Sequence, residues 1–119
     1  LGPHHPKVAV TLNNLAILFM QRALRIRERQ LGQHHLNIAA LLFNLGILYS
    51  VQGNYTEAEP LLQRALHLWE KQLGPQHPLL AYKLKSLAAL YLKQDKYAEA
   101  ESLYQRALHI WEQTPGSDP

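Results

Sequence analysis

The sequence predicts an all-α fold of the α-solenoid type, in which pairs of helices repeat along the chain. "LG" followed by a histidine-containing loop occurs at Leu1, Leu31 and Leu73. Between these loops, apolar residues step by three and four positions, which is the spacing of one helix face. Turn residues recur inside the two later units. Each full unit therefore reads as two helices joined by a turn.

The repeat divides the chain into three units of unequal length. Leu31 and Leu73 are 42 residues apart, whereas Leu1 and Leu31 are only 30 apart. We expect a repeat domain over 1–113, with a shortened unit at 1–30, full units at 31–72 and 73–114, and a flexible tail at 115–119. The aligned matches include Leu42/Leu84, Leu45/Leu87, Tyr49/Tyr91, Tyr55/Tyr97, Ala58/Ala100, Ala65/Ala107 and Trp69/Trp111.

The first unit lacks the twelve residues that hold the turn in the other units. "LFMQRAL" at residues 18–24 passes directly from one helical pattern to the next, and no Gly or Pro lies between Val8 and Gln30. The residues around this junction are good helix formers. The sequence therefore predicts one continuous helix from about Pro6 to Leu31.

A continuous helix cannot fold its first half back onto its second half. Residues 8–20 are therefore expected to project away from the chain and to leave Leu12, Leu15, Leu18 and Phe19 uncovered. We predict that a second copy covers them in a homodimer, by pairing or by domain swapping. A frayed end of a monomer and a higher assembly are the alternatives.

The second unit shows how a full repeat is built. Ile38, Leu42, Leu45 and Tyr49 form the apolar face of its first helix. Gly53 is expected to take positive φ in the turn that follows. The second helix ends at Gly74, and Pro78 suits the first turn of the next helix. The buried side of the second helix is predicted to hold Ala58, Leu61, Leu62, Ala65, Leu66 and Trp69.

Composition excludes several functional classes. The 119 residues are 47% hydrophobic and carry a net charge of +3 with acids and bases interspersed, so no basic face for nucleic acid is expected. No apolar run is long enough to span a membrane. Cysteine is absent, which excludes disulfides and fits a cytoplasmic protein. "LGPHHP" at the start reads as a turn, so no signal peptide is expected.

The pattern Leu45-Gly46-x-x-Tyr49, Gly53, Tyr55, Ala58, Ala65-Leu66 resembles the tetratricopeptide repeat. The 42-residue period with "LGxxHP" and "LNNLA" is similar to the longer version found in kinesin light chains and bacterial sensor proteins. The resemblance covers residues 1–113. It implies a protein-protein interaction scaffold without catalytic activity, and the boundaries suggest a piece of a larger array.

In this family the first helices of the repeats line a concave groove for peptides. Carried over by position, the resemblance places Asn13, Asn14, Ile17, Phe43, Asn44, Ile47, Tyr82, Lys85, Ser86 and Lys93 in the groove, flanked by Val10, Met20, Ser50, Val51, Ala89 and Leu92. Only Asn44 matches the family's carboxylate clamp, so chaperone tails are not expected ligands. The alternative is that these side chains pack against a neighbouring repeat or the dimer partner, in a purely structural self-assembly module.

Neither metal binding nor catalysis is expected. His4-His5, His34-His35 and His77 could ligate zinc or nickel, but no Cys, Asp or Glu accompanies them in the loops. The family resemblance implies instead that a histidine here belongs to the loop and starts the helix. Glutamates two residues apart, such as Glu57 and Glu59, diverge around a helix rather than converge. We therefore predict no metal, no cofactor and no catalytic residue.

Overall fold

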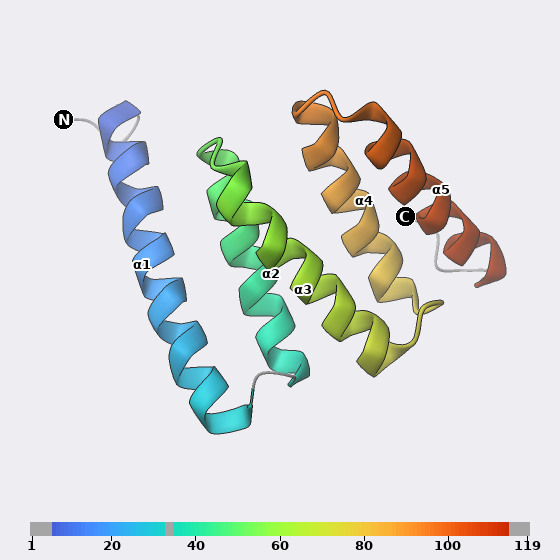
Figure 1. Cartoon of the computed structure of the whole chain (residues 1–119), viewed down its shortest axis with the longest axis horizontal. Coiled ribbons are helices and arrows are strands. Elements are labelled where there is room, and N and C mark those ends of the chain that lie inside the picture. The colour runs from blue at the N-terminus through green and yellow to red at the C-terminus, as the bar shows by residue number, and fades with distance from the viewer. Residues whose placement is uncertain (1–5, 33–34, 115–119) are drawn as a thin grey trace. The chain divides into compact units, whose positions relative to one another are not determined.

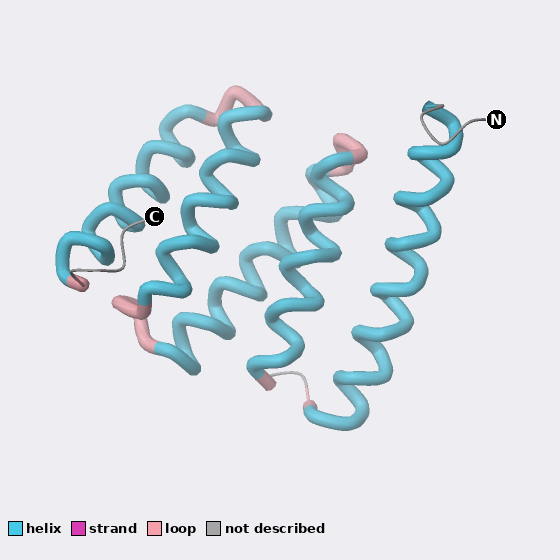
Figure 2. Tube along the Cα trace, turned by 180° about the vertical axis from the view of Figure 1, so that it is seen from behind, coloured by secondary structure: helices cyan, strands magenta, loops and turns pink. Residues whose placement is uncertain are grey.

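The computed structural model describes residues 6–32 and 35–114, and these form helices without any strand (Figures 1 and 2). The helices are α1 (Pro6–Leu31), α2 (Leu36–Val51), α3 (Tyr55–Leu73), α4 (Pro78–Lys93) and α5 (Tyr97–Gln113). The chain forms two compact parts, an N-terminal part that ends at Leu68 and a C-terminal part that begins at Trp69. The predicted all-α helical-repeat fold is confirmed. The predicted tail at 115–119 lies outside the described residues.

The first helix is continuous, as the sequence predicts. α1 has 26 residues, so it is about 39 Å long at ~1.5 Å per residue. It ends where Gly32 takes a φ of 87° and donates its backbone N–H to the Glu28 carbonyl at 2.9 Å. No residue within α1 interrupts its helical hydrogen bonding, because good helix formers occupy the place where the later repeats have a turn.

The turn inside each full repeat depends on one residue with positive φ. Gly53 fills this place between α2 and α3, with a φ of 78°. The equivalent position of the next repeat holds Asp95, at 61°, and Asp is one of the few residues with a side chain that enter this region. The Tyr97 hydroxyl donates a hydrogen bond of 3.1 Å to Asp95 Oδ1. The two turns share a backbone torsion although they do not share a residue.

The core of the N-terminal part is formed by α2 and α3. Leu42 and Leu45 on α2 are buried, and so are Ala58 and Leu62 on α3. A Cβ added to Gly46 would lie 2.7 Å from the Leu62 side chain, which is closer than two carbon atoms can approach. Gly46 therefore allows α2 and α3 to cross at short range, as its small size predicts.

The same pattern recurs in the C-terminal part, where α4 packs along α5. Leu84 and Leu87 on α4 occupy the positions of Leu42 and Leu45, and they are fully buried. Ala100 and Ala107 on α5 are buried at the positions of Ala58 and Ala65. Arg106 on α5 forms an ion pair of 2.8 Å with Glu70 near the end of α3. The predicted repeat is thus one packing arrangement used twice.

Histidines start two of the helices. His35 Nδ1 accepts a hydrogen bond from the backbone N–H of Asn37 at 3.1 Å, and His77 Nδ1 accepts one from Leu79 N–H at the same distance. Both residues are the N-caps of their helices, α2 and α4. An imidazole nitrogen thus does what a Ser or Asp oxygen usually does at this position. His4, His5 and His34 lie outside the described residues.

We expect His77→Ala to lower the free energy of unfolding by about 1 kcal/mol, because one N–H of the first turn of α4 loses its acceptor. His77→Asn should cost much less, because its side-chain oxygen can accept the same bond. Urea unfolding followed by circular dichroism measures both variants. Equal losses for Ala and Asn would show that the cap does not stabilise the helix.

Candidate protein-interaction surfaces

α1 lies antiparallel along α2, and both views show the two helices side by side (Figures 1 and 2). Near one end, Gln52 Nε2 donates a hydrogen bond of 2.7 Å to Asn14 Oδ1. Further along, Gln21 Nε2 donates one of 2.6 Å to the Tyr49 hydroxyl. The expectation that residues 8–20 project away from the rest of the chain is therefore wrong.

The physical reason is a second face of α1. Ile17 and Leu24 are the buried apolar side chains of this helix, and their spacing of seven residues places them on one side of it. Gln21 lies on the same side and contacts α2. The prediction rested on the apolar periodicity of the opposite side, and so missed that α1 can rest on α2 without turning back.

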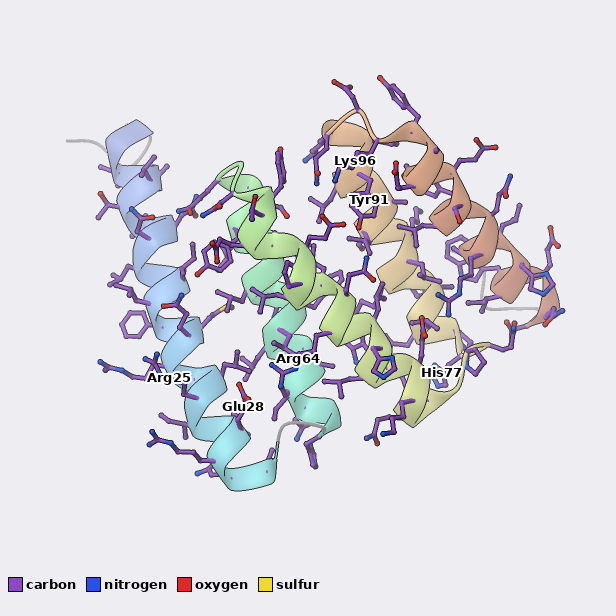
Figure 3. All side chains as sticks on the ribbon, viewed as in Figure 1. Arg25, Glu28, Arg64, His77, Tyr91 and Lys96 are labelled. Atoms are coloured by element: carbon purple, nitrogen blue, oxygen red, sulfur yellow. The ribbon has the colours of Figure 1, made fainter. Side chains whose placement is uncertain are left out.

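Closer to its C-terminal end, α1 also contacts α3. Glu28 Oε2 and Arg64 Nη2, labelled in Figure 3, form an ion pair of 3.4 Å. Both side chains are partly exposed, so this pair contributes no more than about 1 kcal/mol. It joins this end of α1 to α3.

The opposite side of α1 carries a row of exposed apolar side chains. At about 100° per residue, Leu12, Leu15, Phe19 and Ile26 fall within an arc of roughly 60°. They expose 58%, 46%, 62% and 46% of their surface. We call these four residues the outer stripe. Leu18 is also exposed but lies to one side of it.

Three residues of the outer stripe, Leu12, Leu15 and Ile26, occupy positions that are buried in the other repeats, and Phe19 matches the half-buried Tyr49 and the buried Tyr91. Leu12 corresponds to Leu42 and Leu84, neither of which exposes any of its surface. Leu15 corresponds to Leu45 and Leu87, which are also buried. In those repeats the second helix covers these positions. Within the described residues of α1, the four predicted self-association residues Leu12, Leu15, Leu18 and Phe19 are all exposed.

Charge is unevenly distributed along α1. Residues 8–20 contain no charged side chain, whereas residues 21–31 contain Arg22, Arg25, Arg27, Arg29 and a single acid, Glu28. The outer stripe therefore begins on a neutral half of the helix and ends on a basic half.

The predicted groove residues of the N-terminal part fall into two groups. Asn44 is exposed and Ile47 half-buried on α2. Asn13 and Asn14 lie on α1, where Asn14 already accepts the bond from Gln52. Ile17 and Phe43 are buried, at 7% and 5% exposure, so a ligand could not reach them without moving α1.

The groove residues of the C-terminal part are more accessible. Tyr82, Lys85, Ser86 and Lys93 are all exposed on α4. The rings of Tyr82 and Trp111 form a T-shaped pair with centroids 5.8 Å apart, and Lys85 Nζ lies 5.8 Å from the Trp111 ring centre. The Ser86 hydroxyl donates to the Tyr82 carbonyl at 3.1 Å.

Sequence reasoning missed this contact of Tyr82 and Lys85 with Trp111. In the sequence Trp111 stands out only as the match of Trp69. Nothing in the spacing of the α4 residues indicates that a tryptophan on α5 contacts Tyr82 and Lys85. Ile26 was also missed as part of the outer stripe. A signal for it was present, because Leu12, Phe19 and Ile26 recur every seven residues.

Two kinds of site are not found in the part of the chain that the structure describes. Among residues 6–32 and 35–114, no three His, Cys, Asp or Glu side chains gather as metal ligands would. None of the described helices combines the length and the apolar character needed to cross a membrane.

Paired helices with a 42-residue period, and exposed polar and apolar positions on their first helices, define a helical-repeat scaffold of the kind that binds other proteins. The sequence model of the tetratricopeptide repeat matches residues 19–59 and 38–113. The chain belongs to the tetratricopeptide repeat family, whose repeats generally mediate protein-protein interaction. A search of curated proteins finds no match to this chain.

Removal of the bond between Gln21 and Tyr49 tests the packing of α1 on α2. We expect Tyr49→Phe and Gln21→Ala each to lower the free energy of unfolding by about 0.5–1.5 kcal/mol. The double variant should lose less than the two losses added together, because the single variants remove the same bond. Urea unfolding at low protein concentration measures the cycle. Strictly additive losses would mean that the two side chains do not interact.

Proposed function

We propose that this chain is a non-catalytic scaffold that associates with itself through α1 and holds a peptide or protein partner on the surface of its first helices. The observation that carries the proposal is the outer stripe. It is a row of large apolar side chains that stay about half exposed in the part of the chain that the structure describes, at positions that the other repeats bury or half-bury.

The energy available from the predicted self-association residues is moderate. Leu12, Leu15, Leu18 and Phe19 each expose roughly half of their surface. Complete burial of such a side chain is worth about 1.5–3 kcal/mol, so covering the exposed half contributes on the order of 1 kcal/mol. Summed over the side chains of two copies, this contribution falls in the lower part of the range of about 4–15 kcal/mol that association costs. Self-association should therefore depend on protein concentration.

The peptide-binding part of the proposal is supported by accessible polar groups. Asn44 on α2 offers an amide that can both donate to and accept from a peptide backbone. Lys85 and Lys93 on α4 offer positive charge, and Trp111 supports Lys85. The Asn44 amide thus suits a peptide backbone, and the two lysines of α4 separately suit an acidic side chain or terminus. Ile17 and Phe43 are buried beneath this surface, so they would support the exposed residues rather than contact the ligand.

The finer classification is part of the same proposal. The 42-residue period and the loops that begin with "LG" favour the subtype seen in kinesin light chains, with a shortened repeat at residues 1–30. The unbroken α1 supports the shortening, because it occupies the length that one repeat without its turn would have. A cytoplasmic location is consistent with the absence of cysteine.

Light scattering on a sizing column, over a range of protein concentrations, tests self-association. We expect the mass of two chains at high concentration and at least a tenfold weaker association for Phe19→Glu, because a carboxylate would be buried in the interface. Leu108→Glu is the matched control, since Leu108 is also an exposed apolar residue but lies on α5. A wild-type monomer at every concentration would contradict the proposal.

The second candidate is a purely structural self-assembly module whose groove residues are covered by the partner copy. A library of acidic peptides distinguishes the two candidates. If the scaffold proposal is correct, Asn44→Ala and Lys85→Ala weaken peptide binding several-fold and leave the mass unchanged. If no peptide binds, and these substitutions weaken the dimer instead, the structural module is the correct description.

A further inference from the structure

The outer stripe of α1 carries a further inference, which rests on the self-association proposed above. We infer that the outer stripe binds the α1 of a second copy in antiparallel orientation. In this arrangement residues 8–13, in the neutral half of each helix, cover residues 21–26, in the basic half of the other. The partner that covers the outer stripe is thus a second copy of this chain. Each α1 then receives from the other copy the covering helix that its shortened repeat lacks.

The two halves of α1 correspond to the two helices of a full repeat. Residues 8–20 align with the first helix, so that Leu12 and Leu15 match Leu42 and Leu45. Residues 21–31 begin with the same "QRAL" that stands at residues 63–66 and 105–108 in the second helices. Ile26 accordingly matches Leu68, which is buried.

In α1 Leu12, Leu15 and Ile26 lie on one face of one helix, whereas Leu24, which matches Leu66, is buried on the other face. A full repeat brings its two helices together by a turn, but a continuous helix cannot bring its own halves together. Two copies with antiparallel α1 helices can do so, because each first half then meets the second half of the other copy. The contact occurs twice about a two-fold axis, as an isologous dimer requires.

The approach of α2 to α3 gives the register of this pairing. Gly46 of α2 lies against Ala58 and Leu62 of α3. In the alignment of first helices Gly46 matches Ala16 of α1. In the alignment of second helices Ala58 matches the same Ala16, and Leu62 matches Met20. Ala16 of one copy should therefore lie near residues 16–20 of the other. In this register Val8 faces Ile26 of the second copy, and Leu15 faces its Phe19.

Charge favours the antiparallel orientation. In a parallel pair the four arginines of one helix would lie beside the same four arginines of the other, and like charges in contact oppose association. In the antiparallel pair Arg22 and Arg25 lie against residues 9–12 of the other helix, which carry no charge. The aliphatic stem of Arg22, which points to the same side as the outer stripe, can then cover Leu12 of the second copy while its guanidinium stays in water.

The absence of cysteine allows a direct test by cross-linking. Val8→Cys and Ile26→Cys are prepared separately, mixed in equal amounts and oxidised. We expect a disulfide-linked pair that contains one copy of each variant. Neither variant alone should cross-link, because its two cysteines would be about 27 Å apart at ~1.5 Å per residue, well beyond disulfide reach. Leu108→Cys mixed with Val8→Cys controls for random collision.

A distance measurement makes the test independent of disulfide geometry. Nitroxide labels on Gln30→Cys, an exposed position, should be about 40 Å apart in the antiparallel dimer. A parallel dimer would place them less than about 20 Å apart, since neighbouring helices lie ~8–10 Å from each other. Pulsed electron paramagnetic resonance separates these values.

The outcomes distinguish this inference from the proposal beneath it. A wild-type monomer in light scattering overturns both. A dimer in which Val8→Cys cross-links to itself, with a short label distance, overturns the antiparallel pairing alone. A dimer with neither cross-link uses another surface, which also overturns the antiparallel pairing. A chain that associates only with a different protein overturns both the pairing and the self-association. Mixed cross-links with a long label distance confirm the pairing.

Discussion

The structure depends on one constraint, which is that the apolar face of an amphipathic helix must be covered. Within a single chain, a neighbouring helix can cover it only if a turn brings that helix back. The full repeats meet the constraint with a residue at positive φ, Gly53 or Asp95, and with small residues such as Gly46 that let the helices approach closely. α1 has no such turn, and one of its two apolar faces remains in solvent.

Much of the fold could be predicted because it is encoded locally. The continuity of α1 follows from helix formers and from the lack of Gly and Pro, and the starts of α2 and α4 follow from the loop histidines. The packing of α1 on α2 could not be predicted in the same way. Ile17 looks like an exposed groove residue when it is placed by analogy, and it becomes a core residue only because Gln21 and Leu24 rest on α2 with it.

The candidate binding surfaces also divide into features that a local sequence pattern encodes and contacts between helices that it does not encode. Exposure of Leu12 and Phe19 follows from periodicity alone, since a straight helix has no means of covering its far side. The contact of Lys85 with Trp111 joins residues on two helices, and no local pattern encodes such a pair. Asp95 is a related case, because its turn requires a torsion angle rather than a glycine, and the sequence signals for turns favour glycine.

The unbroken α1 also changes the kind of equilibrium that governs its apolar face. In the later repeats the turn holds the covering helix nearby at an effective concentration on the order of millimolar, whatever the amount of protein present. Loss of the turn removes that fixed local concentration. If a second copy covers the face, as proposed above, coverage follows mass action and the fraction of covered chains rises with the amount of protein. A chain of this kind would be sensitive to its own abundance in a way that its intact repeats are not.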